Sequence, residues 1–162
     1  MQNDQINLTE LPEKKVACVS FQGNYVANPE VFKNLFEKLC GWAGPKGLLN
    51  QKVEMLSSYQ DDPHVTPPEK LRVDVCLVVE GDIEVDGEVS MKTLPGGKYL
   101  VMSAELDGPE EYGLAWQKVV DWANENSYVL DMSRPSYEIY KNEPQSHPEG
   151  HHLLDVCLSV KE

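Results

Sequence analysis

The 162-residue sequence lacks the features of several large classes of protein. It contains no apolar run long enough to span a membrane, and its first fifteen residues lack the apolar stretch of a secretory signal. Basic residues are scarce, with 14 Lys and Arg against 27 Asp and Glu and a net charge of −13. Because affinity for nucleic acid comes from Lys and Arg that displace phosphate counterions, this balance argues against direct nucleic-acid binding. We therefore expect a cytoplasmic protein with no membrane or nucleic-acid partner.

Cysteine and recognisable catalytic patterns are also scarce. The four cysteines, Cys18, Cys40, Cys76 and Cys157, lie far apart in apolar segments, which predicts reduced core side chains. No Ser-His-Asp, Cys-His or paired-carboxylate constellation can be identified, which argues against an enzyme without excluding one. "HPEGHH" places three histidines close together, but Pro148 and Gly150 predict an exposed loop there. Since no Cys or carboxylate completes a recognised ligand spacing, we expect no metal site and no cofactor.

The sequence does contain an internal repeat. "LRVDVCLVVE" and "LLDVCLSVKE" share Asp-Val-Cys-Leu at an offset of 81 residues. The offset is 80 between Trp42-Ala43 and Trp122-Ala123, and 83 between Leu11-Pro12 and Leu94-Pro95. Offsets that change only between elements are typical of small insertions in a duplicated fold. We predict a single domain, 1–162, with repeat one at 6–80, an acidic connector at 81–88 and repeat two at 89–161.

Each repeat has the same expected order of elements. Apolar residues at helical spacing predict helices in 28–44 and 108–124, the first with Asn28 as N-cap and Pro29 in its first turn. Runs of β-forming residues predict strands at 14–22, 52–60, 70–80, 98–106, 135–142 and 152–160, with two shorter ones at 5–11 and 88–94.

This order indicates an α+β fold, a tandem pseudo-twofold repeat of strand-helix-strand-strand units with two antiparallel sheets. A helix covers one face of each sheet, so we expect a ligand cleft between the repeats, on the opposite faces. Alternation places Val73, Val75 and their apolar neighbours under the helix, and Arg72, Asp74 and Cys76 on the other face.

Glu138 differs in chemical type from the equivalent residue of repeat one. It shares a strand face with Tyr140, and the equivalent residues of repeat one are Ser57 and Tyr59. Because Glu is rarely buried unless paired, Glu138 is either an exposed strand residue or a buried charge with a purpose.

Three ordered motifs carry a resemblance to a known family. "YQDDPHVTPPEKLRVDVCLVV", "GGKYLVMSAELDGP" and "RPSYEIYKNEP" resemble the GyrI-like small-molecule-binding family, over about residues 5 to 161. The resemblance implies paired strand-helix-strand-strand units around a ligand cleft. In that family the domain is the effector-binding part of AraC-type and MerR-type multidrug regulators, or stands alone as a DNA gyrase inhibitory protein. This chain resembles the stand-alone form, so DNA gyrase or a regulator protein would be a separate partner.

The resemblance also implies a site and three functions. It places Glu138 at the bottom of the cleft, and the further ligand-binding candidates are Tyr140, Tyr59, Ser57, Trp116 and Tyr112. For Trp116 and Tyr112, plain core packing is the alternative. A carboxylate among aromatic rings attracts amphipathic cations, so sequestration of small amphipathic toxins or drugs is the leading expectation. The alternatives are a hydrolase that opens cyclopropane rings of DNA-alkylating compounds, with Glu138 and Tyr140 as catalytic residues, and a protein inhibitor of DNA gyrase.

The remaining charged candidates favour structural roles. Arg72 and Asp74 stand two apart on one strand face, which is typical of an ion pair or of side chains that fix the neighbouring turn. Asp61 and Asp62 precede Pro63 and are expected to shape that turn rather than to hold a metal.

Overall fold

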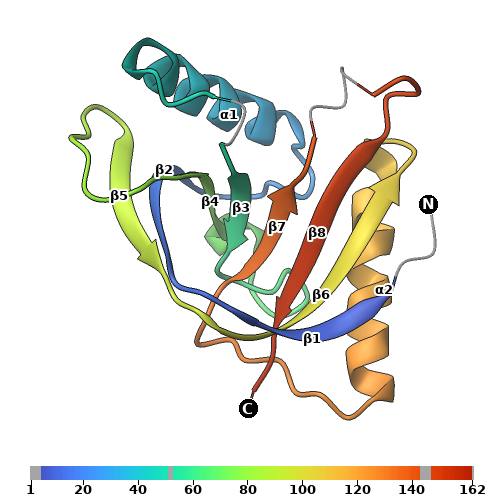
Figure 1. The fold of residues 1–162 in the computed structure, drawn as a ribbon. Helices are drawn as coiled ribbons and strands as arrows, with labels where there is room; N and C mark the ends of the chain where they lie inside the picture. The colour runs from blue at the N-terminus through green and yellow to red at the C-terminus, as the bar shows by residue number, and fades with distance from the viewer. Residues whose placement is uncertain (1–4, 51–52, 143–146, 162) are drawn as a thin grey trace. The chain divides into compact units, whose positions relative to one another are not determined.

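The computed structural model describes residues 5–50, 53–142 and 147–161, and divides into two compact units (Figure 1). The N-terminal unit comprises Glu13–Pro95, and the C-terminal unit comprises Met1–Pro12 with Gly96–Glu162. Lys52, at the start of the expected strand 52–60, lies outside the described residues. In the described part of the chain, no helix has the length and apolar character needed to cross a membrane.

The N-terminal unit is a four-stranded antiparallel sheet with one long helix. Its strands lie in the order β3-β4-β2-β5. Along the chain the elements are β2 (Lys14–Gln22), α1 (Glu30–Ala43), the short 3-10 helix η1 (Gly44–Lys46), β3 (Met55–Tyr59), η2 (Pro68–Lys70), β4 (Arg72–Val78) and β5 (Val89–Leu94).

The C-terminal unit has the same construction, with strand order β7-β8-β6-β1 and all neighbours antiparallel. Its elements are β1 (Ile6–Leu11), β6 (Gly97–Leu106), η3 (Pro109–Glu111), α2 (Tyr112–Glu125), β7 (Ser136–Tyr140) and β8 (His152–Ser159). The α+β class is therefore shown, with an antiparallel sheet and one long helix in each unit.

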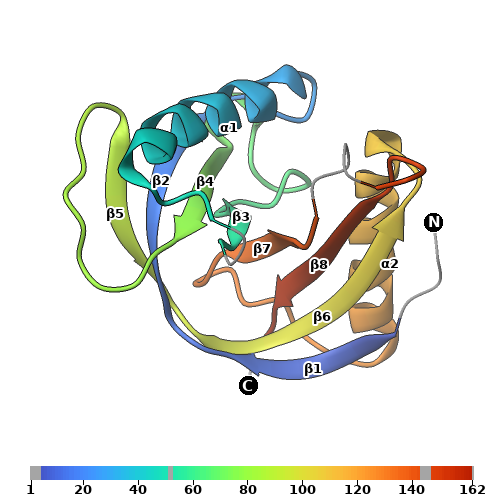
Figure 2. The ribbon, with the colours of Figure 1, turned by 45° about the horizontal axis from the view of Figure 1, so that its top comes forward.

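The short strands β1 and β5 do not stay with the strand that follows them. Only Pro12 and Glu13 separate β1 from β2, yet β1 pairs with β6, as Figure 2 shows, and β5 pairs with β2. Leu11 lies opposite Gly97, and Leu94 lies opposite Lys14. Leu94 follows Leu11 by 83 residues and Gly97 follows Lys14 by the same number, so the two strand pairs have equivalent registers. The compact units thus differ from the expected repeats by an exchange of these two strands. The pseudo-twofold relation and the expected cleft stay predictions.

Both helices bury the same repeat positions. Leu35, Leu39 and Ala43 are buried on α1, and Ala115, Val119 and Ala123 are buried at the matching positions of α2. This spacing forms one apolar stripe per helix, which packs on the apolar face of the sheet in its own unit. The helix α1 begins at Glu30 with Pro29 as N-cap, one residue later than expected.

The predicted strand faces are also present. Leu71, Val73, Val75 and Leu77 join the core beneath α1, as the alternation of β4 predicts. In the C-terminal unit the corresponding residues of β8, Leu154, Val156 and Leu158, lie in the core with α2. The sheet face that α2 covers is the one on which the candidate carboxylate lies.

Candidate functional site

Glu138 is a buried charge on β7. It lies opposite Val156 of β8, whose side chain is in the core beneath α2, and only 3% of Glu138 is exposed. The alternative of an exposed strand residue is therefore wrong. The carboxylate contacts α2 itself, so Glu138 lies on the helix-covered face of its sheet, and its expected place at the bottom of a cleft stays a prediction.

Two aromatic donors hold the carboxylate. The indole Nε1 of Trp116, on α2, donates to Oε2 at 2.6 Å, and the hydroxyl of Tyr140 donates to Oε1 at 2.8 Å. Hydrogen bonds to an ionised acceptor are short and strong, and both carboxylate oxygens receive one here. These bonds offset part of the cost of removing the charge from water.

A second pair adjoins these residues. Tyr112 stands one helical turn before Trp116 on α2, and its hydroxyl lies 2.6 Å from Nδ1 of His152, the first residue of β8. Burial, together with the negative charge of Glu138, raises the pKa of Tyr112, and burial lowers the pKa of His152 against the opposing charge of Glu110. Both pKa shifts favour the neutral forms of the two groups, so the hydroxyl of Tyr112 donates a hydrogen bond to a neutral imidazole.

We call these five residues the Glu138 group: Glu138, Trp116, Tyr140, Tyr112 and His152. The structure brings together four of the six residues expected from the sequence and adds His152, the first residue of the expected strand 152–160, which was not a site candidate. The alternation of β8 could have revealed it, since His152 shares a face with Leu154 and Val156 beneath α2.

Tyr59 and Ser57 lie on β3 of the N-terminal unit. The ring of Tyr59 packs against Tyr25 and Phe32, with centroids 5.7 and 6.1 Å apart, and Ser57 is fully buried. Their membership of a ligand site stays a prediction.

Arg72 and Asp74 bond different partners. Arg72 donates through Nε and Nη2 to the two oxygens of Asp61 at 3.0 and 2.9 Å, and this contact lowers the pKa of Asp61. Asp74 accepts from Lys92 at 2.8 Å and from Gln60 at 2.7 Å. Arg72 thus fixes the turn that contains Asp61, which is one of the two roles expected from the sequence; the other was an ion pair with Asp74.

Asp62 has the expected role in the same turn. Its Oδ1 accepts the backbone N–H of His64 at 2.8 Å. This contact is an Asx-type turn, which needs no metal ion to hold its shape.

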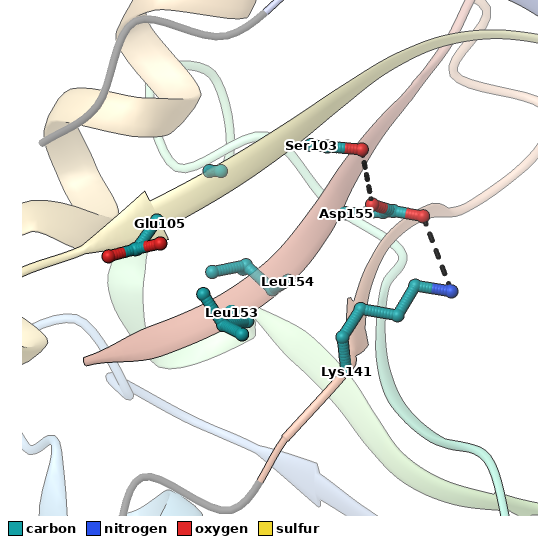
Figure 3. A pocket seen from close by; sticks show the side chains of 7 residues that line it. Ser103, Glu105, Lys141, Leu153, Leu154 and Asp155 are labelled. Atoms are coloured by element: carbon teal, nitrogen blue, oxygen red, sulfur yellow. Dashed lines mark hydrogen bonds and ion pairs between the residues drawn. The ribbon is translucent and has the colours of Figure 1, made fainter. Parts of the chain in front are cut away.

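An open depression of about 430 Å³ lies on the other face of the C-terminal sheet (Figure 3). Leu153 and Leu154 are among its lining residues, and three of its polar side chains bond one another. Ser103 donates to Asp155 at 2.9 Å, and Lys141 lies 3.4 Å from the other carboxylate oxygen. This depression does not contain the Glu138 group, and its Asp155 carboxylate is already paired with Ser103 and Lys141.

The chain is thus an α+β protein in which aromatic donors hold a buried carboxylate between a helix and an antiparallel sheet. The sequence matches the model of the GyrI-like small molecule binding domain over residues 4–161, and the chain belongs to this family. It is 31% identical to the SPbeta prophage-derived protein YosT of Bacillus subtilis, over 97% of this chain and 99% of YosT. It is 28% identical to DNA gyrase inhibitor 1 of Dickeya dadantii, over 78% and 81% of the two chains.

Solved structures share the fold at low sequence identity. The C-terminal domain of EcmrR matches with a TM-score of 0.75 and 15% identity, over 99% of both chains. The chain spans 58% of EcmrR in its complex with DNA. SAV2435, solved with bound tetraphenylphosphonium, matches with a TM-score of 0.65 and 16% identity, over 97% and 94%. A hydrolase from Listeria innocua matches with a TM-score of 0.62 and 12% identity, over 97% and 92%.

Proposed function

We propose that the chain binds small amphipathic molecules, cations among them, at the Glu138 group, and that it protects the cell by sequestering them. The observation that carries this proposal is the burial of a carboxylate, 3% exposed, beneath half-buried aromatic rings. A buried charge costs stability, so its presence favours a role in recognition.

The chemistry of the Glu138 group fits such ligands. The carboxylate attracts a positive charge, and the faces of Trp116, Tyr112 and Tyr140 attract cations and bury apolar surface. These three rings are half-buried, so rotation of their side chains would open a path to Glu138. Membership of a small-molecule binding family supports the same proposal.

Tetraphenylphosphonium is a suitable first probe because it is the ligand in the SAV2435 structure. We expect saturable binding by calorimetry, and we expect Glu138→Gln to weaken it by about 5- to 150-fold, which corresponds to about 1–3 kcal/mol. Triphenylphosphine oxide, which is similar in shape but uncharged, should bind both proteins alike. Glu54→Gln provides a matched control, since Glu54 pairs with Lys14 in the N-terminal unit.

Equal affinity of the wild type and Glu138→Gln for tetraphenylphosphonium would overturn the proposed site. A lack of saturable binding across a panel of hydrophobic cations would overturn the proposed ligand class.

Inhibition of DNA gyrase is the second candidate function, and the names of relatives such as the Dickeya dadantii protein favour it. A supercoiling assay with purified gyrase tests it. An inhibitor that acts through its surface should retain its potency in Glu138→Gln, whereas an inhibitor that needs the intact site should lose it.

Hydrolysis is the third candidate, favoured by the structural neighbour from Listeria innocua and by the hydroxyl of Tyr140 on the carboxylate. Glu138 would orient a water molecule for attack on a cyclopropane carbon, and Tyr140 would assist proton transfer. Incubation of a cyclopropane-bearing alkylator with the protein, followed by mass spectrometry, tests this reaction. Gain of one water in the product, lost in Glu138→Gln, would favour the enzyme over the binding protein.

A further inference from the structure

A cluster of histidine and carboxylate side chains lies outside the Glu138 group. Glu105, His147 and His151 each offer one ligand atom, and these atoms all lie within 4.8 Å of one another. Glu105 is on β6, and the two histidines belong to the segment before β8. Asp107 and Glu149 supply two further carboxylates, with oxygens 3.5 and 3.3 Å from Nε2 of His151.

A tight turn brings the two histidines together. The backbone N–H of Gly150 donates to the carbonyl of His147 at 3.1 Å, and Gly150 has a φ of 72°, which glycine adopts without strain. The turn stacks the two imidazole rings, with centroids 4.7 Å apart and planes inclined by 19°. Two imidazoles four residues apart in the sequence therefore face the same volume.

The strand pairing supplies the third ligand. Glu105 lies opposite Leu153 in the pairing of β6 with β8, which places it beside the end of the histidine turn. Its Oε2 is 2.6 Å from Nδ1 of His151, and the side chain of His151 is only 14% exposed. A rigid sheet and a tight turn thus hold the three side chains before any ion binds.

We propose that Glu105, His147 and His151 form a binding site for a divalent metal ion of the zinc type. Two imidazoles and one carboxylate are a ligand set that Zn²⁺ uses in proteins, with bonds of about 2.0–2.1 Å. In a tetrahedral site the ligand atoms lie roughly 3.3 Å apart, so small side-chain rotations close the present cluster around an ion. The fourth position is left for water or for Glu149.

The surrounding charge favours a cation. Asp107 and Glu149 add negative charge within a few ångströms of the His151 ring, and the backbone N–H of Glu149 orients the His147 ring by donating to its Nδ1 at 3.0 Å. Glu105 also lines the depression of Figure 3, so a bound ion would lie at its rim.

The test uses the full chain without an affinity tag and Zn²⁺ alone as probe. After dialysis, elemental analysis should find about one Zn²⁺ per chain, and calorimetric titration should show one saturable site. His147→Ala and His151→Ala should each weaken binding by more than tenfold. His64→Ala is the matched control, because His64 lies in a turn of the N-terminal unit and should bind Zn²⁺ as the wild type does.

Two further measurements distinguish this site from Zn²⁺ bound elsewhere on the chain. Zn²⁺ should raise the melting temperature of the wild type and of His64→Ala but not that of His147→Ala. Because His147 lies in a turn, its replacement by Ala should leave the fold intact. Co²⁺ should give visible absorption bands without the near-ultraviolet band of thiolate ligation. Absence of saturable Zn²⁺ binding, binding by both histidine variants equal to that of the wild type, or a thiolate band would each overturn the proposal.

Discussion

The indole of Trp116 and the carboxylate of Glu138 are joined by a hydrogen bond of 2.6 Å, which links α2 to β7. The two residues it joins are 22 positions apart in the sequence. It makes the helix part of the environment of the buried charge. Loss of the donor should therefore affect stability as well as ligand binding.

Replacement of Trp116 by Phe keeps an aromatic ring but removes the donor. We expect the free energy of unfolding to fall by about 1–3 kcal/mol, because a buried carboxylate loses a hydrogen bond. Trp42→Phe is the matched control: Trp42 is also half-buried, and its Nε1 donates at 2.7 Å to Asp86 in an exposed contact. Urea unfolding measures both, and equal losses in the two variants would contradict the role of the Trp116 bond.

Glu138→Gln should behave differently in the absence of ligand. The amide oxygen can accept from Trp116, and the amide NH₂ can donate to the hydroxyl of Tyr140, which then acts as acceptor. Since the substitution also removes a desolvated charge, we expect the free energy of unfolding to stay within about 0.5 kcal/mol or to rise. A loss above about 2 kcal/mol in urea unfolding would mean that the fold requires the negative charge.

Much of the local structure could be predicted from the sequence. The strand β2 has the predicted bounds, and the helical spacing predicted both α1 and α2. These features depend on the period of apolar residues within one element. The family resemblance is confirmed by the match over residues 4–161.

Long-range pairing could not be predicted in the same way. The period of β1 shows that it is a strand but not that it pairs with β6, because either neighbouring edge satisfies its backbone. Likewise, Glu105 reaches the histidine turn only through the pairing of β6 with β8, so ligand spacing within "HPEGHH" could not reveal it. Alternation grouped Glu138 with Tyr140, but apolar residues on both faces of β7 left the helix-covered face undetermined.

The negative net charge of the chain predicts that it does not bind nucleic acid. With a net charge of −13, the isolated chain should show no measurable affinity for duplex DNA at physiological salt. Fluorescence anisotropy of a labelled duplex measures this affinity at several salt concentrations. Micromolar binding that weakens as salt rises would contradict the charge argument.

The contact between Asp61 and Arg72 should make stability depend on pH. The hydrogen bonds from Arg72, first among the causes, lower the pKa of Asp61 below its ordinary value of 3.8, against a smaller opposing effect of burial. A carboxyl whose folded-state pKa is lowered stabilises the protein fully above its unfolded-state pKa, and this contribution disappears as the pH falls through the folded-state pKa. Asp61→Asn should therefore be less stable than the wild type by about 1 kcal/mol at pH 7, and the difference should shrink below pH 3.8. Urea unfolding of both proteins from pH 7 to pH 2.5 measures this difference.

Asp82→Asn is the control. Asp82 pairs with Lys15, but its side chain is 91% exposed, so the stability of this variant should follow that of the wild type at every pH. A difference between Asp61→Asn and the wild type that stays constant down to pH 2.5 would show that the carboxyl acts through its shape and not through its charge.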